Sequence, residues 1–197
     1  YTTEELIAAL APLRGSGVPV TVHMRQEGAG VVEALEEMMA VARALRTPVH
    51  ISHLKSIGKA YWGQYMPRML EILTRAREEG LNVSCDLYPY TAGSTQLIHV
   101  LPPESQDGGL AALTKNLREP AFRARMRERM LTGTDFENLS LLVGWENIDV
   151  STVRKKENRR FVGRSIAEIA QAEGVDPFDF TFDLLASEDC TVTMIDR

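Results

Sequence analysis

Apolar residues recur at helical spacing in three stretches of the first ninety residues. Along 31–45 they follow the i, i+3, i+4, i+7 pattern of an amphipathic helix, and 64–79 shows the same pattern. The stretch 3–14 is also amphipathic, and it is preceded by Thr2 and Glu5 at the spacing of a helix capping box. We therefore predict three helices in this part of the chain.

Short runs rich in β-branched residues alternate with these helices. The runs cover 18–23, 48–53 and 81–87, so that equivalent positions lie about 30 residues apart, the length of one β/α unit. Strands joined by helical crossovers are parallel, because a parallel connection needs a dozen or more residues. The pattern predicts an α/β fold with parallel strands, and both a doubly wound sheet and a (β/α)8 TIM barrel fit it.

The regular alternation ends after residue 90. We predict a loop over 91–95, a charged helix near 120–130 and a short strand over 139–143. Ser165 and Glu168 again have capping-box spacing and open another helix. The chain finishes with a last β-rich run.

The change of pattern suggests three segments. Residues 1–90 form the β/α units of a barrel, and residues 91–163 form an insertion of the kind that acts as a lid or substrate loop. Residues 164–197 then return to a barrel β/α unit. Because only part of a barrel is present, we predict a partial barrel whose unpaired strand edges favour a homo-oligomer.

Composition excludes several classes of protein. The net charge is −5 and the sequence has no basic stripe, which argues against a nucleic-acid partner. No apolar run approaches the roughly 18 residues that a membrane helix needs. Two cysteines are too few for a disulfide framework, which favours the cytoplasm. The chain starts without methionine and stops directly after an apolar run, so we expect an internal fragment of a longer protein.

Two histidines follow the first two predicted strands. His23 ends the first β-rich run and His53 ends the second. The carboxyl ends of parallel strands carry the active site in such folds, and neighbouring strands lie about 4.8 Å apart. The two imidazoles can therefore share one metal ion of the zinc type. The alternative is that each is a hydrogen-bonded structural histidine, and spacing alone does not decide between them.

Other polar residues near these strand ends have open roles. Lys55 could bind a substrate carboxylate, or it could be a solvated lysine in a loop. Asp86 could be a metal ligand, a hydrogen-bond partner of a histidine or a turn-forming residue. His50 precedes His53 by an odd number of residues, so we expect it on the opposite face, toward the helix layer. We expect Cys85 to be a small buried apolar residue.

Five segments of the sequence, in order, resemble one known family. They resemble segments of the N-acyl-D-amino-acid deacylases, or D-aminoacylases, of the amidohydrolase superfamily. The matching segments are TVHMRQEG at 21–28, ISHLK at 51–55, DLYPYTAGST at 86–95, LPP at 101–103 and GRSIAEIA at 163–170.

The resemblance implies a (β/α)8 barrel that hydrolyses a small-molecule N-acyl-D-amino acid to a carboxylate and a D-amino acid. It implies that His23 and His53 hold zinc (Zn2+), with one or two ions in the whole protein. It also implies that Lys55, Tyr88 and Ser94 line the substrate site and hold the substrate carboxylate.

Some motifs of the family are not found in this chain. They are the His-x-His pair of the first barrel strand, the metal-bridging cysteine and the catalytic aspartate of a Ser-Asp-Gly motif, which we expect beyond Arg197. Two histidines are an incomplete site, because catalytic zinc usually has three protein ligands. We therefore expect no catalytic residue within this chain, and weak or no metal binding by the chain alone. The alternatives are a cyclic amidohydrolase of the dihydroorotase or hydantoinase type, and a folded fragment without catalytic function.

Overall fold

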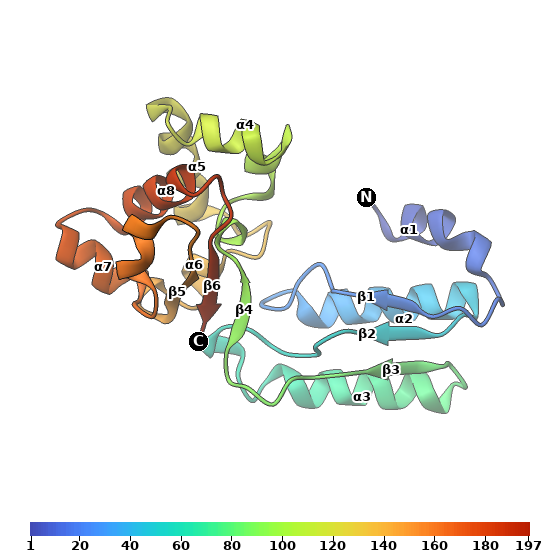
Figure 1. Cartoon of the computed structure of the whole chain (residues 1–197). Helices are drawn as coiled ribbons and strands as arrows, with labels where there is room; N and C mark the ends of the chain where they lie inside the picture. Colours follow the sequence, from blue (N-terminus) through green and yellow to red (C-terminus); the bar gives the residue numbers. More distant parts are fainter. The chain divides into compact units, whose positions relative to one another are not determined.

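The chain consists of two compact units. A computed structural model describes all residues 1–197, and the units are Tyr1–Pro89 and Tyr90–Arg197 (Figure 1). The boundary falls within one residue of the position at which the regular alternation of helices and strands ends in the sequence.

Unit 1 contains a parallel three-stranded sheet with strand order β1-β2-β3. Two helices connect the strands in the order β1-α2-β2-α3-β3. The bounds are Val20–Val22 for β1, Val31–Leu45 for α2, Val49–Ile51 for β2, Tyr65–Glu78 for α3 and Val83–Cys85 for β3. The predicted α/β class with parallel strands is confirmed.

One face of this sheet and both connecting helices share a single apolar core. Val49, Ile51 and Val83 contribute to it from the strands, and α2 and α3 supply most of the remaining side chains. Both helices therefore cover the same face of the sheet, as successive helices do in a (β/α)8 barrel. The alternate strand residues, Thr21 and His50 among them, face the other way and stand side by side in register.

The first helix packs against the same core. It is α1, Thr3–Leu10, and the predicted capping box between Thr2 and Glu5 is present at its start. Leu6, Ile7 and Leu10 contact the core of unit 1 without being fully buried. A short 3-10 helix, η1, Ala11–Leu13, follows, and another, η2, Lys59–Tyr61, precedes α3.

Unit 2 combines five helices with an antiparallel sheet of order β4-β6-β5. The strands are β4 Gly93–Gln96, β5 Ile148–Thr152 and β6 Thr193–Asp196. The helices are α4 Gly109–Asn116, α5 Pro120–Thr132, α6 Leu139–Leu142, α7 Ile166–Glu173 and α8 Pro177–Ser187, with 3-10 turns η3 Leu97–Val100, η4 Pro103–Gln106, η5 Trp145–Asn147 and η6 Lys156–Phe161.

Two local predictions in unit 2 are wrong. Residues 139–143 were expected to form a strand, but Leu139–Leu142 is the short helix α6. A short apolar run has no periodicity that separates a strand from a buried helical turn. Residues 91–95 were expected to be a loop, yet β4 begins at Gly93, because its backbone pairs with β6 from nearly a hundred residues away. By contrast, the predicted capping box of Ser165 and Glu168 is present at the start of α7.

The last strand does not add to a parallel sheet. We expected residues 164–197 to return to a barrel β/α unit, but β6 pairs antiparallel with both β4 and β5 within unit 2. A short apolar run indicates a strand, but it does not indicate whether that strand pairs parallel or antiparallel with its neighbours. Residues 90–197 thus fold as one unit, around buried side chains such as Val150, Phe182 and Met194.

None of the helices has both the length and the apolar character required of a membrane-crossing segment.

Candidate metal centre

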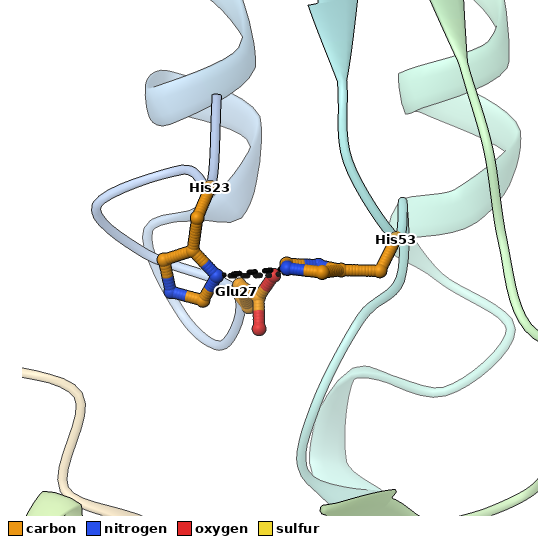
Figure 2. Close-up of side chains that lie close together, drawn as sticks. All are labelled: His23, Glu27 and His53. Atoms are coloured by element: carbon orange, nitrogen blue, oxygen red, sulfur yellow. Dashed lines mark hydrogen bonds and ion pairs between the residues drawn. The ribbon is translucent and has the colours of Figure 1, made fainter. Parts of the chain in front are cut away.

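Three side chains of types that can hold a metal ion meet at the carboxyl ends of β1 and β2 in unit 1 (Figure 2). His23 Nδ1 lies 3.0 Å from His53 Nε2, and the two rings meet edge to face with centroids 4.8 Å apart. Glu27 Oε1 lies 3.0 Å from His53 Nδ1 and 3.8 Å from His23 Nδ1. The prediction that the two imidazoles lie side by side at one end of the sheet is confirmed.

The backbone around His53 turns sharply to aim its ring at His23. His23 directly follows β1, whereas His53 comes two residues after β2 and has a left-handed backbone with φ of 42°. That conformation costs roughly 1 kcal/mol for a residue with a side chain. The turn is held from both sides, because Ser52 donates its N–H to Val22 O at 2.9 Å and Leu54 donates to Asp86 O at 2.9 Å.

Asp86, immediately after β3, links the remaining strand to this turn. Its Oδ1 accepts the backbone N–H of His53, and its Oδ2 lies 3.0 Å from His50 Nε2. The hydrogen bond from His50, together with the backbone N–H of His53, lowers the pKa of Asp86 below its usual value. Of the three roles open to Asp86, the contacts favour that of a partner for histidines.

Two sequence-based expectations near the site are wrong. His50 was expected toward the helix layer, but Val49 and Ile51 on either side of it are the residues that pack on the helices. The alternation of faces holds only inside a strand, and β2 ends at Ile51, two residues before His53. Cys85 was expected to be buried and is exposed, as the last residue of the edge strand β3.

Glu27 is the site residue that sequence reasoning missed. Its side chain is only 4% exposed, and its carboxylate contacts His53 and also Lys55, whose Nζ lies 2.5 Å from Oε2. Glu27 lies in the loop that follows β1, where no periodicity distinguishes a buried glutamate from a solvated one. The only signal was its four-residue distance from His23 within the segment TVHMRQEG.

The residues predicted to bind substrate lie in different units. Lys55 Nζ is 2.9 Å from His53 Nδ1 and 5.8 Å from the centre of the Tyr88 ring, so these two residues adjoin the histidine pair in unit 1. Ser94 belongs to β4 of unit 2, where it is exposed and pairs with Ile195.

The donor set at this site fits a zinc ion. Imidazole nitrogen is a usual zinc ligand, and the two imidazoles supply part of the set that a catalytic zinc site needs. Two nitrogens bound to one tetrahedral zinc at about 2.0–2.1 Å stand roughly 3.3 Å apart. The distance of 3.0 Å between His23 Nδ1 and His53 Nε2 is close to this separation.

Comparison with curated proteins finds relatives of one kind. A D-aminoacylase from Alcaligenes xylosoxydans xylosoxydans is 44% identical over 96 residues, which is 49% of this chain and 19% of that protein. An N-acyl-D-glutamate deacylase from the same organism is 38% identical over 101 residues, 51% of this chain and 19% of that protein. The matched region thus spans about a fifth of the length of these relatives. No protein-family model matches the chain.

Solved structures of similar fold cover nearly the whole chain. An N-acyl-D-glutamate deacylase from Bordetella bronchiseptica, complexed with zinc and a phosphonate mimic of the tetrahedral intermediate, matches with a TM-score of 0.68 and 23% identity over 100% of this chain and 31% of that one. A D-aminoacylase described as defining a subset of the amidohydrolases matches with a TM-score of 0.65 and 27% identity over 99% and 31%. Another D-aminoacylase structure, described by its binuclear metal centre, matches with a TM-score of 0.65 and 26% identity over the same shares of the two chains.

Proposed function

Since this chain is homologous to the N-acyl-D-amino-acid deacylases, we propose that the protein containing it is a zinc-dependent amidohydrolase that cleaves N-acyl-D-amino acids to a carboxylate and a D-amino acid. The observation that carries the proposal is the pair of imidazole nitrogens, His23 Nδ1 and His53 Nε2, held 3.0 Å apart at the end of a parallel sheet.

In this proposal His23 and His53 bind zinc, and the whole protein holds one or two ions. Zinc held by these residues would supply Lewis-acid chemistry, which polarises a carbonyl and makes water more acidic. The backbone of this chain keeps the two rings aimed at one point, because β1 and β2 are hydrogen-bonded neighbours and Asp86 anchors the turn at His53. Further ligands come from other parts of the protein, as catalytic zinc generally has three.

Lys55 and Tyr88 bind the substrate beside the metal. The ammonium group of Lys55 lies next to the ring of His53 and offers a positive charge to the carboxylate of an N-acyl-D-amino acid. The Tyr88 ring is within cation–π distance of that ammonium, and its hydroxyl is a further donor for substrate oxygens.

The proton transfers of the reaction need an acid–base group. None of the residues gathered around His53 is free for this role, since Glu27 is buried between His53 and Lys55. We therefore propose that an aspartate elsewhere in the protein takes the proton of the attacking water and delivers it to the departing amine.

A substrate panel on the full-length protein tests the proposed function. N-acetyl-D-amino acids are compared with their L forms and with cyclic substrates such as dihydroorotate and hydantoins. We expect hydrolysis of the D forms only, with activity lost to a zinc chelator and restored by added zinc. Preferential hydrolysis of the cyclic substrates would show instead an activity of the dihydroorotase or hydantoinase type.

Removing a histidine of the pair tests the metal assignment. His53→Ala should lower zinc affinity and turnover by more than about 100-fold, because even the loss of an outer partner of a metal ligand costs about 10- to 100-fold. His99→Ala is the matched control, since His99 is an exposed histidine of unit 2. Zinc content is measured by atomic spectroscopy after gel filtration, and a His53→Ala protein with normal zinc content and turnover would remove His53 from the site.

A further inference from the structure

We propose that Glu27 is a positioning residue that sets the orientation of a metal-binding histidine and of a substrate-binding lysine at the same time. The inference rests on the proposed function, which gives His53 and Lys55 those roles. The two oxygens of the Glu27 carboxylate divide between them: Oε1 lies 3.0 Å from His53 Nδ1 and Oε2 lies 2.5 Å from Lys55 Nζ.

The contact with His53 fixes which of its nitrogens is free for a metal. A carboxylate can only accept, so a neutral His53 ring that donates to Glu27 carries its proton on Nδ1, the nitrogen 3.0 Å from Oε1. The lone pair is then on Nε2, which is the atom that faces His23 Nδ1 at 3.0 Å. Carboxylates that accept the second ring N–H of a metal-bound histidine orient the ring and raise its basicity.

Lys55 adjoins the same ring nitrogen. Its Nζ also lies 2.9 Å from His53 Nδ1, and because an ammonium group can only donate, it bonds to that nitrogen in the tautomer in which Nδ1 carries no proton. Its own hydrogens have other acceptors in Glu27 Oε2 at 2.5 Å and in the His53 carbonyl oxygen at 3.4 Å. In the tautomer with the proton on Nδ1, which leaves Nε2 to a metal, Glu27 is the acceptor near both the ring and the ammonium group.

The position of Glu27 favours an indirect role over direct ligation. The histidine nitrogen nearest to the Glu27 carboxylate is Nδ1 of His53, which is the ring nitrogen that does not face His23. The distance from Glu27 Oε1 to His23 Nδ1 is longer, 3.8 Å. A carboxylate paired with one nitrogen of a ring leaves the other nitrogen to a metal.

The backbone and the burial of Glu27 hold this geometry in place. Its carbonyl oxygen accepts the N–H of Ile57 at 2.8 Å, which ties the loop after β1 to the segment that carries His53 and Lys55. Its side chain is 4% exposed, and a carboxylate so buried needs partners for its charge. Lys55, a flexible side chain 23% exposed, is thereby kept beside His53 before substrate binds.

The test compares three variants of the full-length protein. Glu27→Gln keeps the shape of the side chain and removes its charge. Lys55→Met removes the ammonium alone. Glu37→Gln is the matched control. Glu37 is a poorly exposed glutamate on α2 that pairs at 2.8 Å with Arg25, a residue in the same loop as Glu27. It contacts neither the histidine pair nor Lys55.

Zinc affinity, from competition with a chelator, and the separate values of KM and kcat are measured for each variant, with thermal unfolding as a check of folding. We expect Glu27→Gln to bind zinc about 10- to 100-fold more weakly and to show a raised KM. Lys55→Met should raise KM alone and retain zinc affinity. Glu37→Gln should change none of the three quantities.

Three outcomes would overturn the inference. If Glu27→Gln binds zinc as tightly as the unaltered protein, the carboxylate does not position His53. If it loses zinc as completely as His53→Ala, Glu27 is a direct ligand. If the unaltered protein itself binds no zinc, the proposed function fails and takes this inference with it, a result distinct from a change confined to Glu27→Gln.

Discussion

His53 combines an unusual backbone conformation with contacts at its backbone N–H and at both ring nitrogens. Its φ of 42° is supported by Asp86, its Nδ1 faces Glu27 and its Nε2 faces His23. A conformation that costs energy persists where the surroundings over-determine it, and such positions cluster at functional sites. The three strands of unit 1 each contribute through the segment that follows them, so the site depends on the sheet as a whole.

Replacing Asp86 should weaken the site without removing a ligand. In Asp86→Ala the backbone N–H of His53 and the ring of His50 both lose their acceptor, so we expect zinc affinity to fall by about 10- to 100-fold. Asp86→Asn keeps an oxygen for the N–H of His53 and should lose less. Chelator competition measures both, and equal affinities for all three proteins would exclude a role for Asp86 in holding His53.

At this scale the sequence predicted the histidine pair and placed Lys55 and Asp86 near it, but it did not predict Glu27 or the face on which His50 lies. His23 and His53 could be placed because the ends of parallel strands meet at one edge of a sheet. Glu27 could not, since its burial depends on a tertiary contact between its loop and Ile57. His50 and His53 do not follow one two-residue alternation, because β2 ends at Ile51 and a turn separates them.

Among the elements, the helices and parallel strands of unit 1 were predicted well from the sequence, and the antiparallel pairing of unit 2 was not. The helices α2 and α3 carry long periodic patterns, and the capping boxes of α1 and α7 are local in sequence. The sheet of unit 2 instead joins β4 to β6 across most of the unit, and no local pattern specifies that partnership.

One buried carboxylate stabilises the link between α8 and the segment after β5. Glu188 directly follows α8 and is 1% exposed, and it accepts the backbone N–H of Arg154 at 2.7 Å and of Lys155 at 3.1 Å. The side-chain amide of Asn158 donates to it at 2.5 Å. Burial alone raises the pKa of Glu188, but these hydrogen bonds outweigh it and the pKa is lowered.

The lowered pKa gives unit 2 a defined response to acid. Because the folded pKa of Glu188 lies below the unfolded value of about 4.3, its stabilisation is fully present above that value and is lost as the pH falls through the folded pKa. Glu188→Gln should cost about 1–3 kcal/mol at neutral pH and flatten the acid limb of stability against pH. Urea unfolding at a series of pH values measures both, and an unchanged acid limb would contradict this assignment.

At the scale of the molecule, unit 1 is a sheet with open sides. The outer edges of β1 and β3 have no ladder partner, and Thr21 and Ser84 are exposed on the face away from the helices. Parallel sheets normally have both faces covered. Such a unit is typical of part of a barrel, which agrees with the share of the related proteins that the chain matches.

The chain produced alone should therefore associate and lack activity. Open strand edges favour pairing with another copy, and the proposed site has two histidines but no acid–base group. We expect oligomers by light scattering and no hydrolysis of N-acetyl-D-amino acids with zinc added. A clean monomer would contradict the role of the edges, and turnover would contradict the proposal that the acid–base group lies elsewhere.

Cys85 is exposed, so its thiol can be labelled for spectroscopy. It is one residue from Asp86 at the end of β3, whereas Cys190, the other thiol of this chain, is buried and has its pKa raised by that burial. Thiolates, and not thiols, react with maleimides, so a fluorophore offered to this chain attaches to Cys85 first. The native sequence thus carries its own labelling position beside the strand end that supports His53, where emission can follow the occupation of the site by an ion.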